Sequence, residues 1–172
     1  NDSFLIFLSS YLYGNTQDLP TTEKAKIKVN NPYAISKKIC EEECQKYVLN
    51  SGLKLSVIRP FNIYGYFPNG NQIVMKIIKQ IIYNKKIKVN DLNPKRDMLY
   101  IKDFCNFINL LIEKLPKNEI FNVGSGLSIS IEDMITKIKK IFDSSAEVIV
   151  SNEARPNEIH ETQADISKAN KL

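Results

Sequence analysis

Near the start of this 172-residue chain, Phe4-Leu5-Ile6-Phe7-Leu8 runs straight into Ser9-Ser10. Five apolar residues in a row are typical of a parallel strand that is buried on both faces of its sheet. A second such strand is predicted from Leu55 to Arg59, after a helix that follows Pro32 and ends at Ser51-Gly52. We therefore expect an α/β protein in which the polar residues after each strand lie at the carboxyl edge of the sheet, where such folds bind ligands.

The first turns of that helix contain Tyr33-Ala34-Ile35-Ser36-Lys37. In a helix, Tyr33 and Lys37 lie one turn apart on the same face, so an ammonium can sit beside a phenol. A cation about 4–5 Å away stabilises a phenolate by roughly 3–4 kcal/mol at an effective dielectric constant of about 20, before desolvation opposes it. The spacing predicts an acid/base tyrosine, with Ser9 at the end of the first strand to hydrogen-bond the same substrate oxygen. Because Tyr-x-x-x-Lys is common by chance, the surrounding motifs decide the interpretation.

Six motifs follow one another along the chain. They are Ser9-Ser10-Tyr11-Leu12-Tyr13-Gly14, Pro32-Tyr33-Ala34-Ile35-Ser36-Lys37, Arg59-Pro60-Phe61-Asn62-Ile63-Tyr64-Gly65, Arg96-Asp97-Met98-Leu99-Tyr100-Ile101-Lys102-Asp103, Phe121-Asn122-Val123-Gly124-Ser125-Gly126 and Arg155-Pro156-Asn157-Glu158. Together they resemble the extended short-chain dehydrogenase/reductase family, specifically the NAD-dependent epimerase/dehydratase enzymes that act on nucleotide-sugars. The resemblance covers essentially the whole chain.

This resemblance implies the last part of a doubly wound parallel Rossmann-type sheet, joined to a smaller mixed α/β substrate-binding domain. We assign residues 1–66 to the dinucleotide-binding domain and residues 67–172 mainly to the substrate-binding domain. In the second part the sequence predicts helices at 72–84, 103–114 and 130–142 and strands at 87–89, 119–123 and 146–150. Such enzymes begin with a Gly-x-x-Gly-x-x-Gly turn that approaches the cofactor pyrophosphate, and this chain has no such turn. We therefore expect a carboxyl-terminal portion of a longer enzyme, inactive when isolated.

The resemblance also implies which residues perform the chemistry. Ser9, Tyr33 and Lys37 would be catalytic. NAD or NADP would be the cofactor, with Lys37 bound to the nicotinamide ribose hydroxyls, Tyr33 beside it and Pro60 bordering the nicotinamide ring.

Four further residues would bind the nucleotide-sugar substrate. Asn62 would bind the diphosphate through its side-chain amide, and Arg96 and Arg155 would bind the diphosphate or the adjoining ribose. A guanidinium suits that task because it makes paired, charge-assisted bonds to phosphate oxygens. Tyr13 would line the sugar pocket, although a buried aromatic behind the serine loop is an equally good interpretation.

Three other polar residues of the second part are assigned structural roles. Ser130 precedes two acids and predicts the N-cap of the helix at 130–142. Asp103 is expected to cap the helix at 103–114, and Asp97 is also assigned to structure.

The residues after Ser9 bear on the reaction. Sugar-nucleotide 4,6-dehydratases that resemble this chain have an Asp-Glu pair there, because the elimination of water needs an additional acid and base. Here Ser10 and Tyr11 occupy those positions, and neither can act as a carboxylate. Epimerisation is therefore preferred, with ketoreduction as the alternative. A non-catalytic remnant that binds sugar-nucleotides remains a third interpretation.

Composition excludes several other classes of protein. The net charge of +5 comes from lysines spread among acids, without a block of like charges, which argues against nucleic-acid binding. Cys40 and Cys44 lack nearby further ligands, and the single histidine, His160, is distant in sequence, so no metal site is expected. No apolar run approaches the roughly 20 residues of a membrane span. We expect a cytoplasmic enzyme that binds no membrane, and the resemblance implies a homodimer formed through the helix that contains Tyr33.

Overall fold

The computed structural model describes residues 3–66, 72–153 and 158–172 as an α/β protein. Its elements, in chain order, are β1 (Phe4–Leu8), α1 (Pro32–Ser51), β2 (Lys54–Pro60), β3 (Asn62–Tyr64), α2 (Ile73–Asn84), β4 (Lys86–Val89), β5 (Lys95–Tyr100), α3 (Ile101–Lys114), β6 (Glu119–Val123), β7 (Ser128–Ser130), α4 (Ile131–Ile141), β8 (Glu147–Val150) and the short 3-10 helix η1 (Ala169–Lys171).

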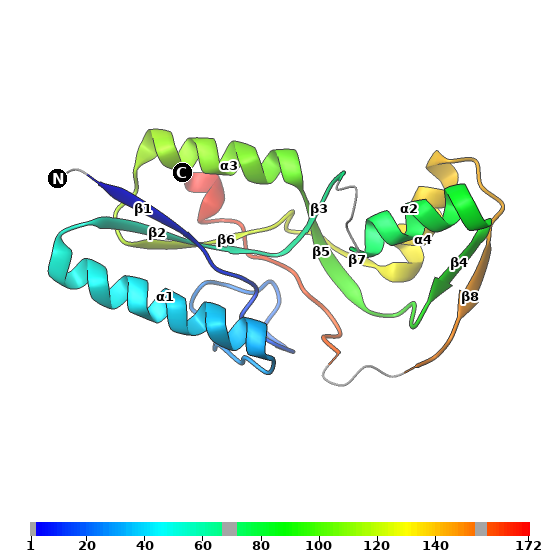
Figure 1. Ribbon diagram of the computed structural model, residues 1–172, viewed down its shortest axis with the longest axis horizontal. Helices are drawn as coiled ribbons and strands as arrows, with labels where there is room; N and C mark the ends of the chain where they lie inside the picture. The colour runs from blue at the N-terminus through cyan, green and yellow to red at the C-terminus, as the bar shows by residue number, and fades with distance from the viewer. Residues whose placement is uncertain (1–2, 67–71, 154–157) are drawn as a thin grey trace.

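The first sheet has the strand order β1-β2-β6, and all of its strands are parallel. Helix α1 lies along one face of this sheet and α3 along the other (Figure 1). Side chains alternate along β2: Leu55 and Val57 pack with Val48 of α1, whereas Ile58 packs with Phe121 in the cluster beneath α3. The predicted doubly wound α/β fold class is confirmed.

Two details of the first sheet differ from the sequence-based prediction. The strand at 119–123, expected in the smaller domain, is β6 and pairs with β2, because its side chains Phe121 and Val123 complete the core beneath α3. β1 was expected to be buried on both faces, yet Leu5 and Leu8 are 36% and 44% exposed. Among the described strands, β1 pairs with β2 alone and therefore forms an edge.

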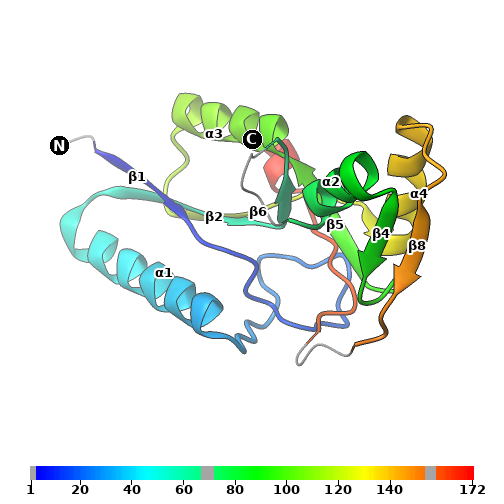
Figure 2. The same cartoon turned by 45° about the vertical axis from the view of Figure 1, so that its right-hand side comes forward.

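The rest of the chain forms two smaller sheets, with the strand orders β3-β5-β7 and β4-β8. Figure 2 brings this lobe forward and shows α2 and α4 packed beside β4 and β8. Ile77 and Ile81 of α2, Ile87 of β4, and Met134 and Ile138 of α4 share one buried cluster. The buried side chains of α2 and α4 thus form the core of this lobe.

The helix ends follow local signals. The side chain of Asn31 accepts a hydrogen bond from the backbone N–H of Ala34 (2.9 Å), and Pro32 starts α1. Gly52 ends α1 in the left-handed region, at φ 71°. Ser130 caps α4 as predicted, by accepting a hydrogen bond from the backbone N–H of Asp133 (3.0 Å).

The prediction for Asp103 was wrong. Helix α3 begins at Ile101, with Tyr100 at the N-cap position, because the helix continues directly from the last residue of β5. Asp103 instead lies in the first turn, where a carboxylate complements the positive end of the helix dipole.

Candidate functional site

Lys37 links the start of α1 to the end of β1. Its Nζ donates a hydrogen bond to the carbonyl of Leu8 (2.9 Å) and lies 5.9 Å from the centroid of the Tyr33 ring. The next residue, Ser9, continues the parallel ladder by donating its backbone N–H to the carbonyl of Ile58 (2.8 Å). Lys37 therefore contacts both Tyr33 and the strand end that bears Ser9, so the structure brings the three predicted catalytic residues to one edge of the sheet.

The hydroxyl of Ser9 has no hydrogen-bond partner among the described residues, although its residue is only 4% exposed. A buried polar group without a partner costs about 1–3 kcal/mol, so such groups are rare without a function. Tyr33, by contrast, is 61% exposed. Lys37 thus lies between an accessible phenol and the strand end that precedes a buried hydroxyl without a partner among the described residues.

The same edge has the chemistry to bind a nicotinamide cofactor. An ammonium has three N–H donors, and the bond to Leu8 leaves two of those on Lys37 for ribose hydroxyls or the phenol. Pro60 is half-buried at the carboxyl end of β2, the strand paired with β1. The donors present therefore fit the nicotinamide-ribose part of the cofactor.

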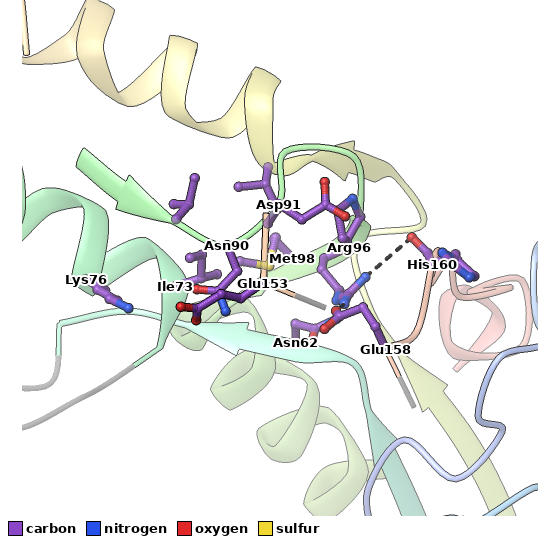
Figure 3. Close-up of a pocket in the computed structure, with 13 residues that line it drawn as sticks. Asn62, Ile73, Lys76, Asn90, Asp91, Arg96, Met98, Glu153, Glu158 and His160 are labelled. Carbon is purple, nitrogen blue, oxygen red and sulfur yellow. Dashed lines mark hydrogen bonds and ion pairs between the residues drawn. The ribbon is translucent and has the colours of Figure 1, made fainter. Parts of the chain in front are cut away.

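A cavity of about 420 Å³ lies in the second lobe, and Asn62 and Arg96 both line it. Figure 3 shows the Arg96 side chain close to Asn62 and Glu158. Arg96 is paired with Glu158, and its Nη1 donates to the carbonyls of Lys95 (2.8 Å) and His160 (3.5 Å). The structure thus places two of the predicted substrate residues in one cavity. Arg155, the third, lies outside the described residues.

Sequence reasoning did not assign most of the cavity lining. Its apolar part comes from several elements: Ile73, Val89, Pro94, Met98 and Ile131. Its other polar and charged residues are Lys76, Asn90, Asp91, Glu153, Glu158 and His160. Period-two alternation along β5 could have identified Met98, because residues two apart in a strand face the same side and Arg96 faces the cavity.

The structure corrects the assignment of Tyr13 to the sugar pocket. Tyr13 is fully buried, and its hydroxyl donates to Oδ1 of Asn122 (2.6 Å) and accepts from Nη1 of Arg59 (2.9 Å). Burial raises the pKa of Tyr13 above its usual value, so the group is a neutral member of the core. The alternative interpretation, a buried aromatic behind the serine loop, describes it.

Arg59 of β2 and Glu41 of α1 form a buried ion pair between the helix and the sheet. Each residue is 3% exposed, and Nε and Nη2 of Arg59 donate to the two carboxylate oxygens of Glu41. Arg59 also donates to the carbonyl of Glu23 (3.2 Å), in the long loop before α1. Burial opposes the charge of Arg59, but its bonds to Glu41 and Tyr13 outweigh burial and raise its pKa. Arg59 therefore connects β2 to α1 and to the loop before α1.

Tyr11 lies in the loop between Ser9 and Tyr13. Its hydroxyl donates to the carbonyl of Gly14 (2.8 Å), and its ring contacts Phe61 edge to face at 5.0 Å. Burial raises the pKa of Tyr11 to about 12, with a smaller contribution from Tyr13. At neutral pH this phenol is therefore a hydrogen-bonding group and cannot act as a base.

Two searches of the described residues bear on other classes of function. No group of three or more His, Cys, Asp or Glu residues is arranged to hold a metal ion in the described ranges. Among the described helices, none has the length and apolar character that a membrane crossing requires.

The chain is similar to several known proteins. The model of the NAD dependent epimerase/dehydratase family matches residues 2–124. A putative UDP-glucose 4-epimerase from Methanocaldococcus jannaschii is 32% identical over 98% of this chain and 56% of its own length. A GDP-6-deoxy-D-talose 4-dehydrogenase from Aggregatibacter actinomycetemcomitans is 30% identical over 84% of this chain and 49% of its own length.

The chain is also similar to a solved structure of a nucleotide-sugar epimerase. The UDP-glucuronic acid 4-epimerase from Bacillus cereus, in complex with UDP-glucuronic acid and NAD, superposes with a TM-score of 0.89 at 28% identity. The alignment covers 98% of this chain and 55% of that enzyme. The chain therefore spans about half the length of the relatives that it matches.

Proposed function

The chain belongs to the NAD-dependent epimerase/dehydratase family, and from this premise we propose that it supplies the acid/base residues and the substrate cavity of a nucleotide-sugar epimerase. The observation that carries the proposal is the position of Lys37, in contact with both Tyr33 and the strand end before Ser9. The orphaned Ser9 hydroxyl supports it, because a substrate oxygen would supply the missing partner.

In this mechanism the sugar hydroxyl binds Oγ of Ser9 and gives its proton to Oη of Tyr33. The ammonium of Lys37 stabilises the phenolate that accepts it. Tyr33, Lys37 and Pro60 would hold NAD, which would supply reversible acceptance of the hydride, taken from the same carbon on one face and returned to it on the other. The resulting ketone turns in the pocket, and Tyr33 then returns the proton to the oxygen. The cycle inverts one sugar carbon and leaves no net oxidation.

We propose that the cavity lined by Asn62 and Arg96 binds the nucleoside diphosphate, with Arg155 as a further ligand. Its volume, about 420 Å³, lies within the range of small-molecule sites. The guanidinium of Arg96 lines this cavity and pairs with Glu158, so a diphosphate would take the place of that carboxylate.

Arg96→Ala tests this cavity. We expect the affinity for UDP or GDP to fall about 10- to 100-fold, since a hydrogen bond to a charged group is worth about 1.5–3 kcal/mol. Isothermal titration of the 172-residue chain measures it. Arg59→Lys is unsuitable as a control because Arg59 is buried, whereas Lys38→Ala removes a cation from the exposed side of α1 and should leave the affinity unchanged. Equal affinities for wild type and Arg96→Ala would contradict the assignment.

A hybrid enzyme tests the reaction itself. The amino-terminal half of the Bacillus cereus relative, joined to this chain, would be given a panel of nucleotide-sugars while nicotinamide absorbance and product stereochemistry are followed. Redox-neutral inversion would support the epimerase. Net consumption of reduced cofactor would indicate a ketoreductase, the alternative favoured by the similarity to the GDP-6-deoxy-D-talose 4-dehydrogenase. Loss of water would indicate a dehydratase, which Ser10 and the neutral Tyr11 disfavour.

We also propose that two copies associate through α1. Ile35 and Ile39 are 43% and 52% exposed on this helix, which supports an apolar contact. Gel filtration of the chain should give the mass of a dimer, and Ile39→Glu should give the monomer. A wild-type chain that elutes as a monomer at every concentration would contradict this contact.

A further inference from the structure

Asp97 lies on β5 between two residues that line the substrate cavity, Arg96 and Met98. Because side chains alternate along a strand, the carboxylate of Asp97 points to the other side, where it is fully buried. The cavity lining does not include it. Any effect of Asp97 on the cavity must therefore be exerted through neighbouring residues that line it.

The carboxylate of Asp97 accepts hydrogen bonds from two other segments of the chain. Its Oδ1 accepts from the backbone N–H (2.6 Å) and the hydroxyl (2.7 Å) of Ser125. Its Oδ2 accepts from the backbone N–H groups of Gly126 (3.0 Å) and Ala164 (2.9 Å). Backbone donors thus solvate the buried charge, and among the described residues no lysine or arginine forms an ion pair with it.

The segments that meet at Asp97 come from both parts of the fold. Ser125 and Gly126 follow β6, a strand of the first sheet, whereas Asp97 belongs to β5, in the sheet that borders the cavity. The approach is close: a Cβ at Gly124 would lie 2.6 Å from Oδ2 of Asp97 and 2.8 Å from Cβ of Ala164. Glycine at this position leaves room for the carboxylate against the loop.

The main chain of Asp97 holds a second cavity residue. Its carbonyl accepts a hydrogen bond from Nδ2 of Asn62 (3.2 Å), and the same Nδ2 donates to Oγ1 of Thr162 (3.1 Å). The backbone N–H of Asp97 donates to that Thr162 hydroxyl as well (3.0 Å). A shift of β5 at Asp97 would therefore move Arg96 and release Asn62 together.

We propose that Asp97 is a positioning residue for substrate binding: by anchoring β5 to the loop after β6, it holds Arg96 at the cavity in the arrangement that binds the diphosphate, while both amide N–H groups of Asn62 stay bound to Thr162 and the Asp97 carbonyl and fix β3 beside β5. The proposal rests on the function proposed for the cavity. It assigns Asp97 no contact with substrate.

Asp97→Asn tests the proposal with little change in shape. An amide presents one acceptor oxygen and an N–H₂ group, so two of the present donors would face another donor. We expect the affinity for UDP and GDP to fall at least tenfold in isothermal titration, while the affinity for UMP and GMP falls less than threefold. A general loss of folded protein would reduce both affinities equally, so the ratio of diphosphate to monophosphate affinity separates positioning from stability. Asp103→Asn, which also neutralises an acid but in the first turn of α3, should leave both affinities unchanged.

The titrations can fail in ways that separate the positioning role of Asp97 from the function proposed for the cavity. If the wild-type chain binds neither UDP nor GDP, the proposed function of the cavity fails. If the wild type binds them and Asp97→Asn keeps the same ratio of affinities, the positioning role is wrong. If Asp97→Asn does not fold, Ser125→Ala decides, because at this exposed residue it removes the hydroxyl bond to Oδ1, with the contacts of the same hydroxyl to the backbone of Leu127, and keeps the three backbone bonds to the carboxylate. A ratio lowered at least twofold in that variant supports the role, and an unchanged ratio overturns it.

Discussion

Tyr33→Phe in the hybrid enzyme is expected to lower turnover about 10²- to 10⁴-fold, the usual contribution of a positioned acid/base. The ring that Lys37 contacts at 5.9 Å from its centroid would remain, and only the hydroxyl would be lost. Since the cavity that contains Arg96 is lined from β3, α2, β4, β5 and α4, the affinity for UDP or GDP should not change. Turnover under saturating substrate and isothermal titration measure the two quantities separately.

Tyr47→Phe provides a matched control for this substitution. Tyr47 lies on the same helix and is 63% exposed, so its variant also removes one accessible phenol from α1. It should turn over at the wild-type rate. Turnover of Tyr33→Phe within a few-fold of the wild type would remove Tyr33 from the chemistry.

Glu41→Ala is expected to destabilise the chain by about 3–5 kcal/mol, because it leaves the guanidinium of Arg59 buried without its counter-charge. Both side chains of the pair are only 4% exposed, so water cannot readily replace the carboxylate. Urea unfolding followed by circular dichroism measures the change in free energy of unfolding. Glu42→Ala removes the neighbouring acid, whose pair with Lys38 is solvent-exposed, and should cost less than about 1 kcal/mol.

A paired substitution distinguishes loss of the counter-charge from loss of packing. Glu41→Leu with Arg59→Met replaces both charges by apolar groups and should recover most of the stability lost in Glu41→Ala. A loss of less than 1 kcal/mol in Glu41→Ala would mean that Arg59 finds another partner and that the pair does not hold α1 on the sheet.

The sequence predicted those elements that have strong local signals. Pro32 and Gly52 mark the ends of α1, and the apolar run before Ser9 marks β1. The strands β3 and β7 were missed because each has only three residues, and β5 because it contains polar residues such as Arg96 and Asp97, whose strand conformation depends on pairing within their sheet. β6 was found, but sequence spacing did not reveal that β2 is its partner.

The residues of the candidate site also differ in how well the sequence predicts their positions. Tyr33 and Lys37 lie within one helix, so periodicity alone placed them together. Arg59 and Glu41 are 18 residues apart on different elements, and a charged pair that is buried looks in sequence like two surface residues. Tyr13 could not be assigned by pattern, because only the position of Asn122 on β6 shows where its hydroxyl binds.

Epimerisation by the hybrid enzyme in D₂O tests most directly whether this site performs redox chemistry on a sugar. If Tyr33 moves the proton of a hydroxyl while hydride leaves and returns to the same carbon, proton NMR of the product will show no solvent deuterium at the inverted carbon. Full deuterium incorporation there would mean that the carbon itself exchanges a proton with solvent, and would contradict the account.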